Sequence, residues 1–285
     1  MGAGGFSGGS LAVFTALAPA GAVAFAIAAL FVLVRRDVPD RAVDRLSHML
    51  IVPLGVAWAG FIASATHLGT PANALYAVSG LGRSPLSNEV VAALLFLLVA
   101  GVYWLYTFTI DYKRGLARLL AALSVVSCIA MVGFMAFAYS VPTVPSWDTW
   151  HTPVDLCLTS LLGGCALGAS LLRTLLPETR RWRAVLRGMT LAVLVISAIM
   201  LVWHAAFLAD VSNNVATAGD SVPFYGALIA VHAALGAVGV GLQQKSARSA
   251  GWKAAVVDAC GCALVLAAVL MARIPFYAAY LSVGF

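Results

Sequence analysis

Long apolar runs separated by short polar connections constrain this chain more than any other feature. A helix that crosses a membrane needs roughly 20 consecutive apolar residues, because the hydrocarbon core of a bilayer is about 30 Å thick. Runs of this kind lie near 9–34, 46–66, 87–110, 117–140, 153–176, 184–208, 224–243 and 254–280. The sequence therefore predicts an all-α integral membrane bundle of eight transmembrane helices, built as a single domain over residues 1–285.

The composition supports a membrane location. Hydrophobic residues make up 62% of the sequence and charged residues only 10%, whereas about a quarter of the residues in a soluble domain are charged. The first apolar run follows no basic segment and is long enough to span, so we expect it to be a retained helix rather than a cleaved signal peptide.

The positions of the basic residues predict the topology. Of the 17 Lys and Arg residues, 15 lie in or beside the connections that follow the first, third, fifth and seventh runs. Because basic connections stay on the cytoplasmic side, both termini are expected outside. The net charge of +6 therefore reflects topology, and we expect no nucleic-acid partner.

The five cysteines all lie inside apolar runs and have no metal-ligand spacing. They are Cys128, Cys157, Cys165, Cys260 and Cys262. Small buried hydrophobic residues are the expected role. We therefore predict no iron–sulfur or zinc site in this protein.

Unusual polar residues collect at the end of the bundle that is poor in basic residues. Ionisable groups near a membrane are costly and are candidates for function. His67 ends the second run in the segment His67-Leu68-Gly69-Thr70-Pro71, and Glu89 begins the third at a similar membrane level. A histidine exchanges protons near neutral pH, so these two side chains could form a proton-accepting pair. The alternative for His67 is a cap on its own helix.

Helix capping also competes with function around the third run. Ser87 or Asn88 would make a suitable N-cap, and Glu89 in the first turn would suit the helix dipole. Arg273 lies in an apolar stretch and needs a carboxylate, a ligand oxygen or water, unless it reaches the interface. Tyr277 follows one turn later, where interfacial aromatic residues are common.

His204 and His232 raise a separate possibility. They fall inside the sixth and seventh runs at similar depth, as two axial ligands of a b-type haem would. A hydrogen-bonded packing role is the alternative for each. No second histidine pair exists at the inner depth, where His48 stands alone.

The order of several short motifs resembles the anchor subunit family of anaerobic dimethyl sulfoxide reductases, called DmsC. The matching elements are His67-Leu68-Gly69-Thr70-Pro71, Leu86-Ser87-Asn88-Glu89, Val144-Pro145-Ser146-Trp147, Pro223-Phe224-Tyr225-Gly226-Ala227-Leu228 and Arg273 followed by Phe276-Tyr277. This resemblance covers about residues 10–283. It implies a haem-free anchor in a bacterial cytoplasmic membrane that oxidises menaquinol for anaerobic respiration.

The resemblance also implies partners and site residues. Electrons would pass to an iron–sulfur subunit and then to a molybdopterin catalytic subunit, both expected on the outer face. His67 and Glu89 correspond to the family's proton-accepting pair. The predicted quinol-binding set is His67, Gly69, Arg83, Ser87, Asn88, Glu89, Arg273 and Tyr277.

Three other functions fit the same residues. A transporter or proton channel could use a polar path through His67, Glu89, Asp155 and Arg273. A scaffold could tether soluble subunits without chemistry of its own. A bis-histidine haem b anchor would use the pair in the sixth and seventh runs.

Overall fold

The structure is a computed structural model that describes residues 4–35, 39–66, 78–109, 113–175, 179–212 and 217–281. Within these ranges, eight helical segments are long and apolar enough to cross a membrane. They are Gly8–Val34, Arg41–Ala65, Pro85–Tyr106, Arg114–Ala138, His151–Leu171, Arg180–Asp210, Tyr225–Ser246 and Trp252–Ala278. Each one overlaps a run expected from the sequence, so the predicted all-α bundle of eight spans is confirmed.

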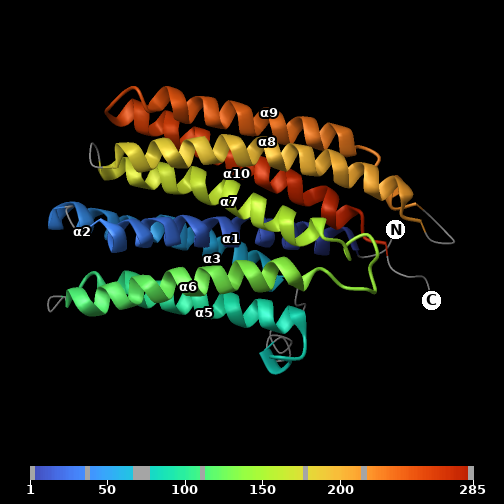
Figure 1. Cartoon of the computed structure of the whole chain (residues 1–285), viewed down its shortest axis with the longest axis horizontal. Helices are drawn as coiled ribbons and strands as arrows, with labels where there is room; N and C mark the ends of the chain where they lie inside the picture. The colour runs from blue at the N-terminus through green and yellow to red at the C-terminus, as the bar shows by residue number, and fades with distance from the viewer. Residues whose placement is uncertain are drawn as a thin grey trace.

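The helices lie side by side along one axis, and the first occupies the centre (Figure 1). α1 (Gly4–Val34) packs against α3 (Ile51–Ala65), α6 (Arg114–Ala138), α7 (His151–Leu171) and α10 (Trp252–Ala278). Consecutive helices pair around it. α5 (Pro85–Tyr106) packs on α6, α7 on α8 (Arg180–Asp210), and α9 (Tyr225–Ser246) on α10.

The second span contains a short additional helix, because the chain stays helical beyond its apolar run. α2 (Asp40–Met49) joins α3 at Leu50 and has one polar face and one buried face. Arg41 and Arg45 are exposed, whereas Leu46 and Leu50 are 1% exposed. An amphipathic helix of this kind suits the boundary between membrane and water.

Glycines and alanines bring α1 close to its neighbours. A Cβ atom on Gly21 of α1 would lie 2.5 Å from the backbone nitrogen of Ala57 in α3. A Cβ atom on Gly163 of α7 would lie 2.7 Å from the Cβ of Ala20. Small residues permit such contacts, and the resulting packing holds membrane helices together.

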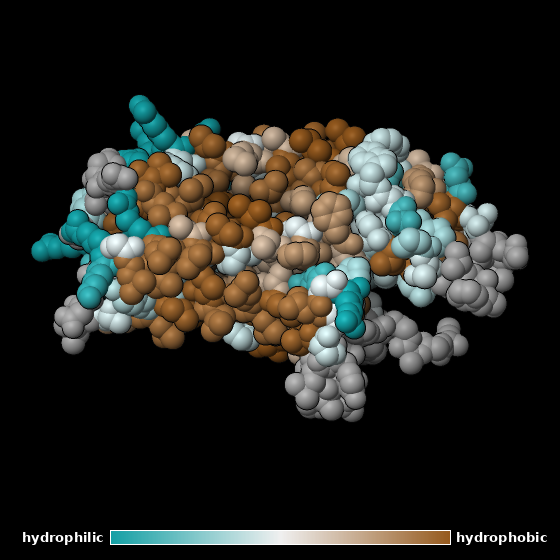
Figure 2. Space-filling view, turned by 60° about the horizontal axis from the view of Figure 1, so that its bottom comes forward, coloured by the Kyte–Doolittle hydropathy of each residue, from teal (hydrophilic) through white to brown (hydrophobic). Residues whose placement is uncertain are grey.

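The surface has a broad apolar band between two more polar ends (Figure 2). One end holds the connections that follow α1, α5, α7 and α9, where the basic residues concentrate, and it is called the basic end below. α1 begins and α10 ends at the opposite end, called the distal end (Figure 1). The assignment of these ends to the two sides of the membrane stays a prediction.

Candidate functional site

Glu89 is held inside the bundle by the way α5 begins. The N-cap of α5 is Ser84, whose hydroxyl accepts a hydrogen bond from the backbone nitrogen of Ser87 at 3.5 Å, and Pro85 opens the helix. The prediction of a cap at Ser87 or Asn88 is therefore wrong. The helix begins earlier, at Pro85, because proline has the φ angle that suits the first helical position. Glu89 lies beyond the first turn and is 0% exposed, so helix-end stabilisation does not account for it.

Asn88 secures the turn before α5. Its Oδ1 accepts a hydrogen bond from the backbone N–H of Gly82 at 2.7 Å. Gly82 has a φ of 77°, a conformation that favours glycine. Ser87 is buried and Arg83 is exposed. These contacts give Asn88 a structural role in shaping the entry to α5.

The carboxyl group of Glu89 has only one hydrogen bond within the described residues. The hydroxyl of Tyr139 donates to Oε1 across 3.4 Å, while Oε2 is buried without a partner. Leaving a buried acceptor unsatisfied costs about 1–3 kcal/mol. Most buried polar atoms in proteins have a hydrogen-bond partner. The missing partner of Oε2, near the end of a span, therefore makes Glu89 a candidate group for binding a ligand or a proton.

Aromatic side chains surround Tyr139. Its ring packs edge-on against Trp147, Phe276 and Tyr277, with centroid distances of 5.9, 5.9 and 5.7 Å. Burial raises the pKa of Tyr139 well above its ordinary value of about 10, and the charge of Glu89 raises this pKa further. Tyr139 is thus a protonated donor to Glu89 at neutral pH.

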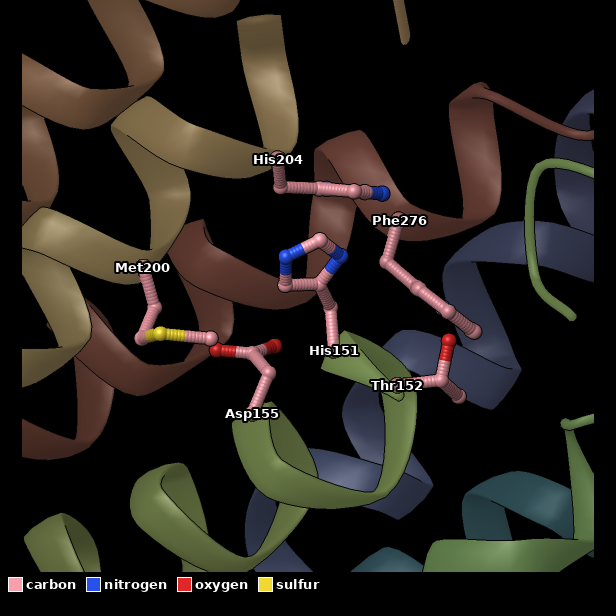
Figure 3. Close-up of a pocket in the computed structure, with 6 residues that line it drawn as sticks. All are labelled: His151, Thr152, Asp155, Met200, His204 and Phe276. Carbon is pink, nitrogen blue, oxygen red and sulfur yellow. The ribbon is translucent and has the colours of Figure 1, made fainter. Parts of the chain in front are cut away.

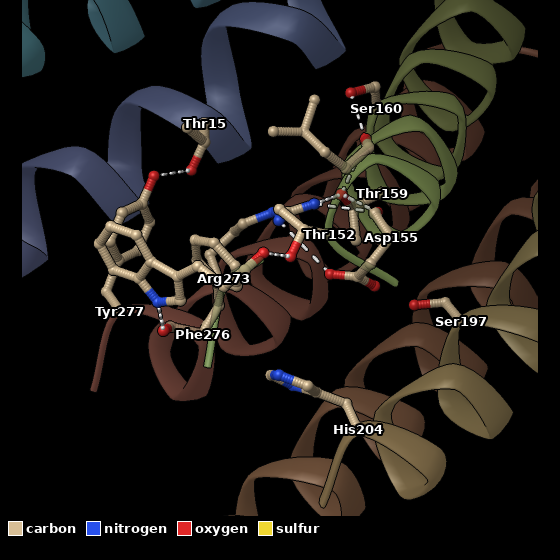
Figure 4. A network of polar contacts seen from close by, with 12 residues as sticks. Thr15, Thr152, Asp155, Thr159, Ser160, Ser197, His204, Arg273, Phe276 and Tyr277 are labelled. Atoms are coloured by element: carbon tan, nitrogen blue, oxygen red, sulfur yellow. Dashed lines mark hydrogen bonds and ion pairs between the residues drawn. The ribbon is translucent and has the colours of Figure 1, made fainter. Parts of the chain in front are cut away.

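Arg273 lies at the centre of a second polar group (Figure 4). It is 1% exposed, and its guanidinium pairs with the carboxylate of Asp155 at 3.4 Å. It also donates to the backbone carbonyl of Asp155 at 2.9 Å and to the hydroxyl of Thr159. The sequence left a carboxylate, a ligand oxygen, water or the membrane interface as possible partners of this arginine, and the structure identifies the carboxylate of Asp155 on α7.

A small cavity adjoins this ion pair (Figure 3). Its volume is about 10 Å³, close to the space that one water molecule needs. It is lined by His151, Thr152, Asp155, Met200, His204 and Phe276. Both ring nitrogens of His151 and the Oδ1 atom of Asp155 are buried without hydrogen-bond partners. Polar atoms around a water-sized space favour an ordered water at this position.

The two intramembrane histidines are hydrogen-bonded to protein groups. His232 is 0% exposed, and its ring nitrogens contact the hydroxyl of Ser197 at 3.3 Å and the carbonyl of Ala268 at 2.8 Å. His204 contacts the hydroxyl of Tyr225 at 2.7 Å. A haem iron on His232 would have to replace one of its two hydrogen bonds, so the geometry fits the packing role better. No group of three or more His, Cys, Asp or Glu side chains suited to a metal occurs in the described ranges.

The structure brings some of the predicted residues together, and others lie outside the residues that it describes. Glu89 and Tyr277 meet through Tyr139, and Arg273 lies on the same helix one turn before Tyr277. His67 and Gly69 fall outside the described residues. The sequence reading missed Tyr139, because an aromatic residue at the end of a span is common at a membrane interface.

These features define a class of protein: a multi-pass helical membrane protein with buried ionisable groups near one end of its bundle. The family model described as DMSO reductase anchor subunit (DmsC) matches residues 1–279. The protein therefore belongs to the DMSO reductase anchor subunit family, as its motifs indicated.

Curated relatives agree with this assignment. The sequence is 31% identical over 276 residues to the C subunit of anaerobic dimethyl sulfoxide reductase from Escherichia coli strain K12, covering 96% of this protein and 95% of the relative. It is 27% identical to the anaerobic dimethyl sulfoxide reductase subunit YnfH of the same organism, covering 88% and 86%. It is 25% identical to the C subunit of the Haemophilus influenzae reductase, covering 75% and 76%.

Proposed function

We propose that this protein is the menaquinol-oxidising anchor of a DMSO reductase type complex in a bacterial cytoplasmic membrane. Membership of the anchor subunit family supports an anchoring role. The relatives are named as parts of anaerobic dimethyl sulfoxide reductases, which suggests the same respiratory reaction for this complex. An iron–sulfur subunit and a molybdopterin catalytic subunit are the expected partners.

The observation that carries the proposal is the unsatisfied carboxyl group of Glu89. Oxidation of a quinol to a quinone releases two electrons and two protons, so the site needs proton acceptors. Glu89 offers one oxygen to Tyr139 and keeps the other without a partner. A carboxylate in this position would accept the proton from one quinol hydroxyl as a general base.

The other residues divide the remaining tasks. His67 is the proposed acceptor of the second proton, because imidazole titrates near neutral pH. Arg273 and Tyr277 occupy one face of α10 near the site, and Arg273 is fixed by Asp155. The two electrons leave to the iron–sulfur subunit, which passes them to the molybdopterin subunit.

The positive-inside rule predicts which side of the membrane the site faces. Glu89 and Arg273 lie toward the distal end, away from the basic end. If the basic end faces the cytoplasm, as the positive-inside rule predicts, then both termini and the site lie on the outer side. The iron–sulfur partner would dock over the distal end, where the electron path is shortest.

The test compares quinol-dependent turnover by the whole complex with Glu89→Gln and His67→Ala. Each change is expected to lower turnover by about 100-fold or more, the usual contribution of a general base. Turnover driven by a reduced dye that feeds the soluble subunits directly should be unchanged, and those subunits should remain bound. Asp44→Asn, an exposed carboxyl on α2, is the matched control.

Two outcomes would contradict the proposal. Full quinol-dependent turnover in Glu89→Gln would show that the buried carboxyl group has a structural role and is not the proton acceptor. Proton or solute flux through the isolated protein in liposomes, abolished by the same substitution, would favour the transport hypothesis instead.

A further inference from the structure

A groove runs along the membrane-facing surface between α1, α7 and α8, at the basic end and far from Glu89. Its cavity volume is about 420 Å³, within the range of about 300–1,000 Å³ that small-molecule sites occupy. Its walls include Ile27 of α1, Cys165 of α7, and Val185 and Met189 of α8. Val185 is 61% exposed and Met189 is 40% exposed, so the groove opens sideways toward lipid.

The length of the groove along α8 is close to the thickness of the hydrocarbon layer of one membrane leaflet. Along α8 its lining extends from Arg181 to Met189, which is about 12 Å at a rise of 1.5 Å per residue. One leaflet contributes about 15 Å of hydrocarbon, half of the core thickness. An extended acyl chain would therefore lie along the groove from the interface toward the midplane.

Among the described residues that line this apolar groove, positive charge lies only at one mouth. Arg181, exposed at the start of α8, is the charged residue of the lining. The next residue, Trp182, packs edge-on against Phe31 at a centroid distance of 5.5 Å. The guanidinium of Arg35 lies 6.0 Å from the centroid of the same Phe31 ring. Arg35, directly after α1, and the lining residue Trp182 of α8 thus lie next to the same Phe31 ring.

Buried arginines strengthen the positive field behind the mouth. Arg183 is 3% exposed, and its charge is repelled by Arg173 and Arg187, while Asp258 attracts it. Arg173 is anchored to the carbonyls of Ser246 and Ser249 at 2.9 and 2.8 Å. Among the described residues of this end, three buried arginines are accompanied by one buried carboxylate, that of Asp258, so its interior has an excess of positive charge.

We propose that this groove is a binding site for an anionic phospholipid. One acyl chain lies between α1, α7 and α8, the phosphate contacts Arg181 and Arg35, and the Trp182 ring stands at the level of the headgroup. Charge complementarity selects the headgroup, since each basic residue near the surface adds about 1 kcal/mol of attraction to anionic lipid. A quinone is a poorer occupant, because the apolar walls offer its carbonyl oxygens no donor away from the mouth.

The experiment measures lipid retained by the intact complex. The complex is equilibrated in nanodiscs with equal amounts of phosphatidylglycerol and phosphatidylethanolamine, extracted with mild detergent, and analysed by native mass spectrometry. The unmodified complex should retain phosphatidylglycerol. Arg181→Gln should lower its retention about fivefold, and the double change with Arg35→Gln about 25-fold. Arg248→Gln, an exposed arginine at the same end but outside the groove, is the control.

A second pair of variants tests the groove itself without changing charge. Val185→Trp should fill the groove and displace the lipid. Val195→Trp, on the same helix, 52% exposed and outside the lining, should not. Equal retention of both lipids, or retained phosphatidylglycerol that Arg181→Gln and Val185→Trp leave unchanged, would overturn the proposal. So would the release of a bound quinone, rather than a lipid, from the Val185→Trp complex.

Discussion

Arg273 and Asp155 form a pair in which neither side chain can be removed alone without consequence. The arginine is 1% exposed and the aspartate 14%. Arginine stays charged at any accessible pH, so its burial requires a permanent negative or polar partner. Asp155 supplies both a carboxylate and a backbone carbonyl, which orients the guanidinium and joins α10 to α7.

Arg273→Gln should destabilise the complex by about 3–5 kcal/mol, because it leaves the largely buried carboxylate of Asp155 without its cation. Asp155→Asn should destabilise the complex by a similar amount, because it leaves the guanidinium of Arg273 buried without its anion. In the double variant the two losses should not add, since the same interaction is removed once. Thermal unfolding of the purified complex measures all three, and Arg83→Gln, an exposed arginine, serves as the control. Additive losses in the double variant would show that the two residues act independently.

Tyr139 should act as a neutral donor over the whole working range of pH. A group with a raised pKa stays protonated up to that pKa, and burial raises the pKa of Tyr139 well above its ordinary value. Tyr139→Phe should therefore lower quinol-dependent turnover about fivefold, through loss of a hydrogen bond of about 1 kcal/mol, and leave the alkaline limb of the pH profile unchanged. An alkaline limb that disappears in Tyr139→Phe would mean that Tyr139 ionises during turnover.

The sequence predicts some of these residues and not others, for identifiable reasons. Glu89 and Arg273 stand out because charged residues are rare in apolar runs. The partner of Arg273 is 118 residues earlier in the sequence, and no local pattern encodes that contact. The cap of α5 is hard to place from sequence because Ser84 and Ser87 are both suitable caps, and only the position of Pro85 distinguishes them.

At the scale of the helices, glycines on one helix can have different roles. Gly239 of α9 faces Gly261 of α10, and a Cβ on either one would lie 2.6 Å from the carbonyl oxygen of the other. Gly241, two residues later, has no atom within 4 Å of the corresponding position. The sequence shows both as small residues suited to packing, and the three-dimensional arrangement alone separates them.

Gly239→Val should push α9 away from α10, whereas Gly241→Val should be tolerated. Overpacking usually costs about 1–3 kcal/mol, so the first variant should lower the unfolding temperature of the protein and the second should leave it close to that of the unmodified form. Both variants introduce the same β-branched residue at a similar position in the same helix, so they differ mainly in the contact with α10. Equal destabilisation by both variants would show that helix propensity, rather than contact with α10, is responsible.

At the scale of the whole molecule, the eight spans follow from hydropathy because the bilayer sets their length. The helix pairing is less accessible from sequence. Each helix is apolar over much of its circumference, and hydropathy does not show which side faces protein and which faces lipid. The central place of α1 depends instead on small residues such as Gly21 and on glycines of α7 that face it.

The orientation of the bundle can be tested on both ends at once. In a background without the five native cysteines, Arg248→Cys at the basic end and Leu81→Cys at the distal end introduce exposed thiols. If the positive-inside rule holds, a membrane-impermeant maleimide added to intact cells should label Leu81→Cys alone. Arg248→Cys should become reactive only in inverted vesicles. The reverse pattern would place Glu89 nearer the cytoplasm, and the iron–sulfur partner would then have to dock on that side, because its cluster must lie within electron-transfer distance of the quinol site.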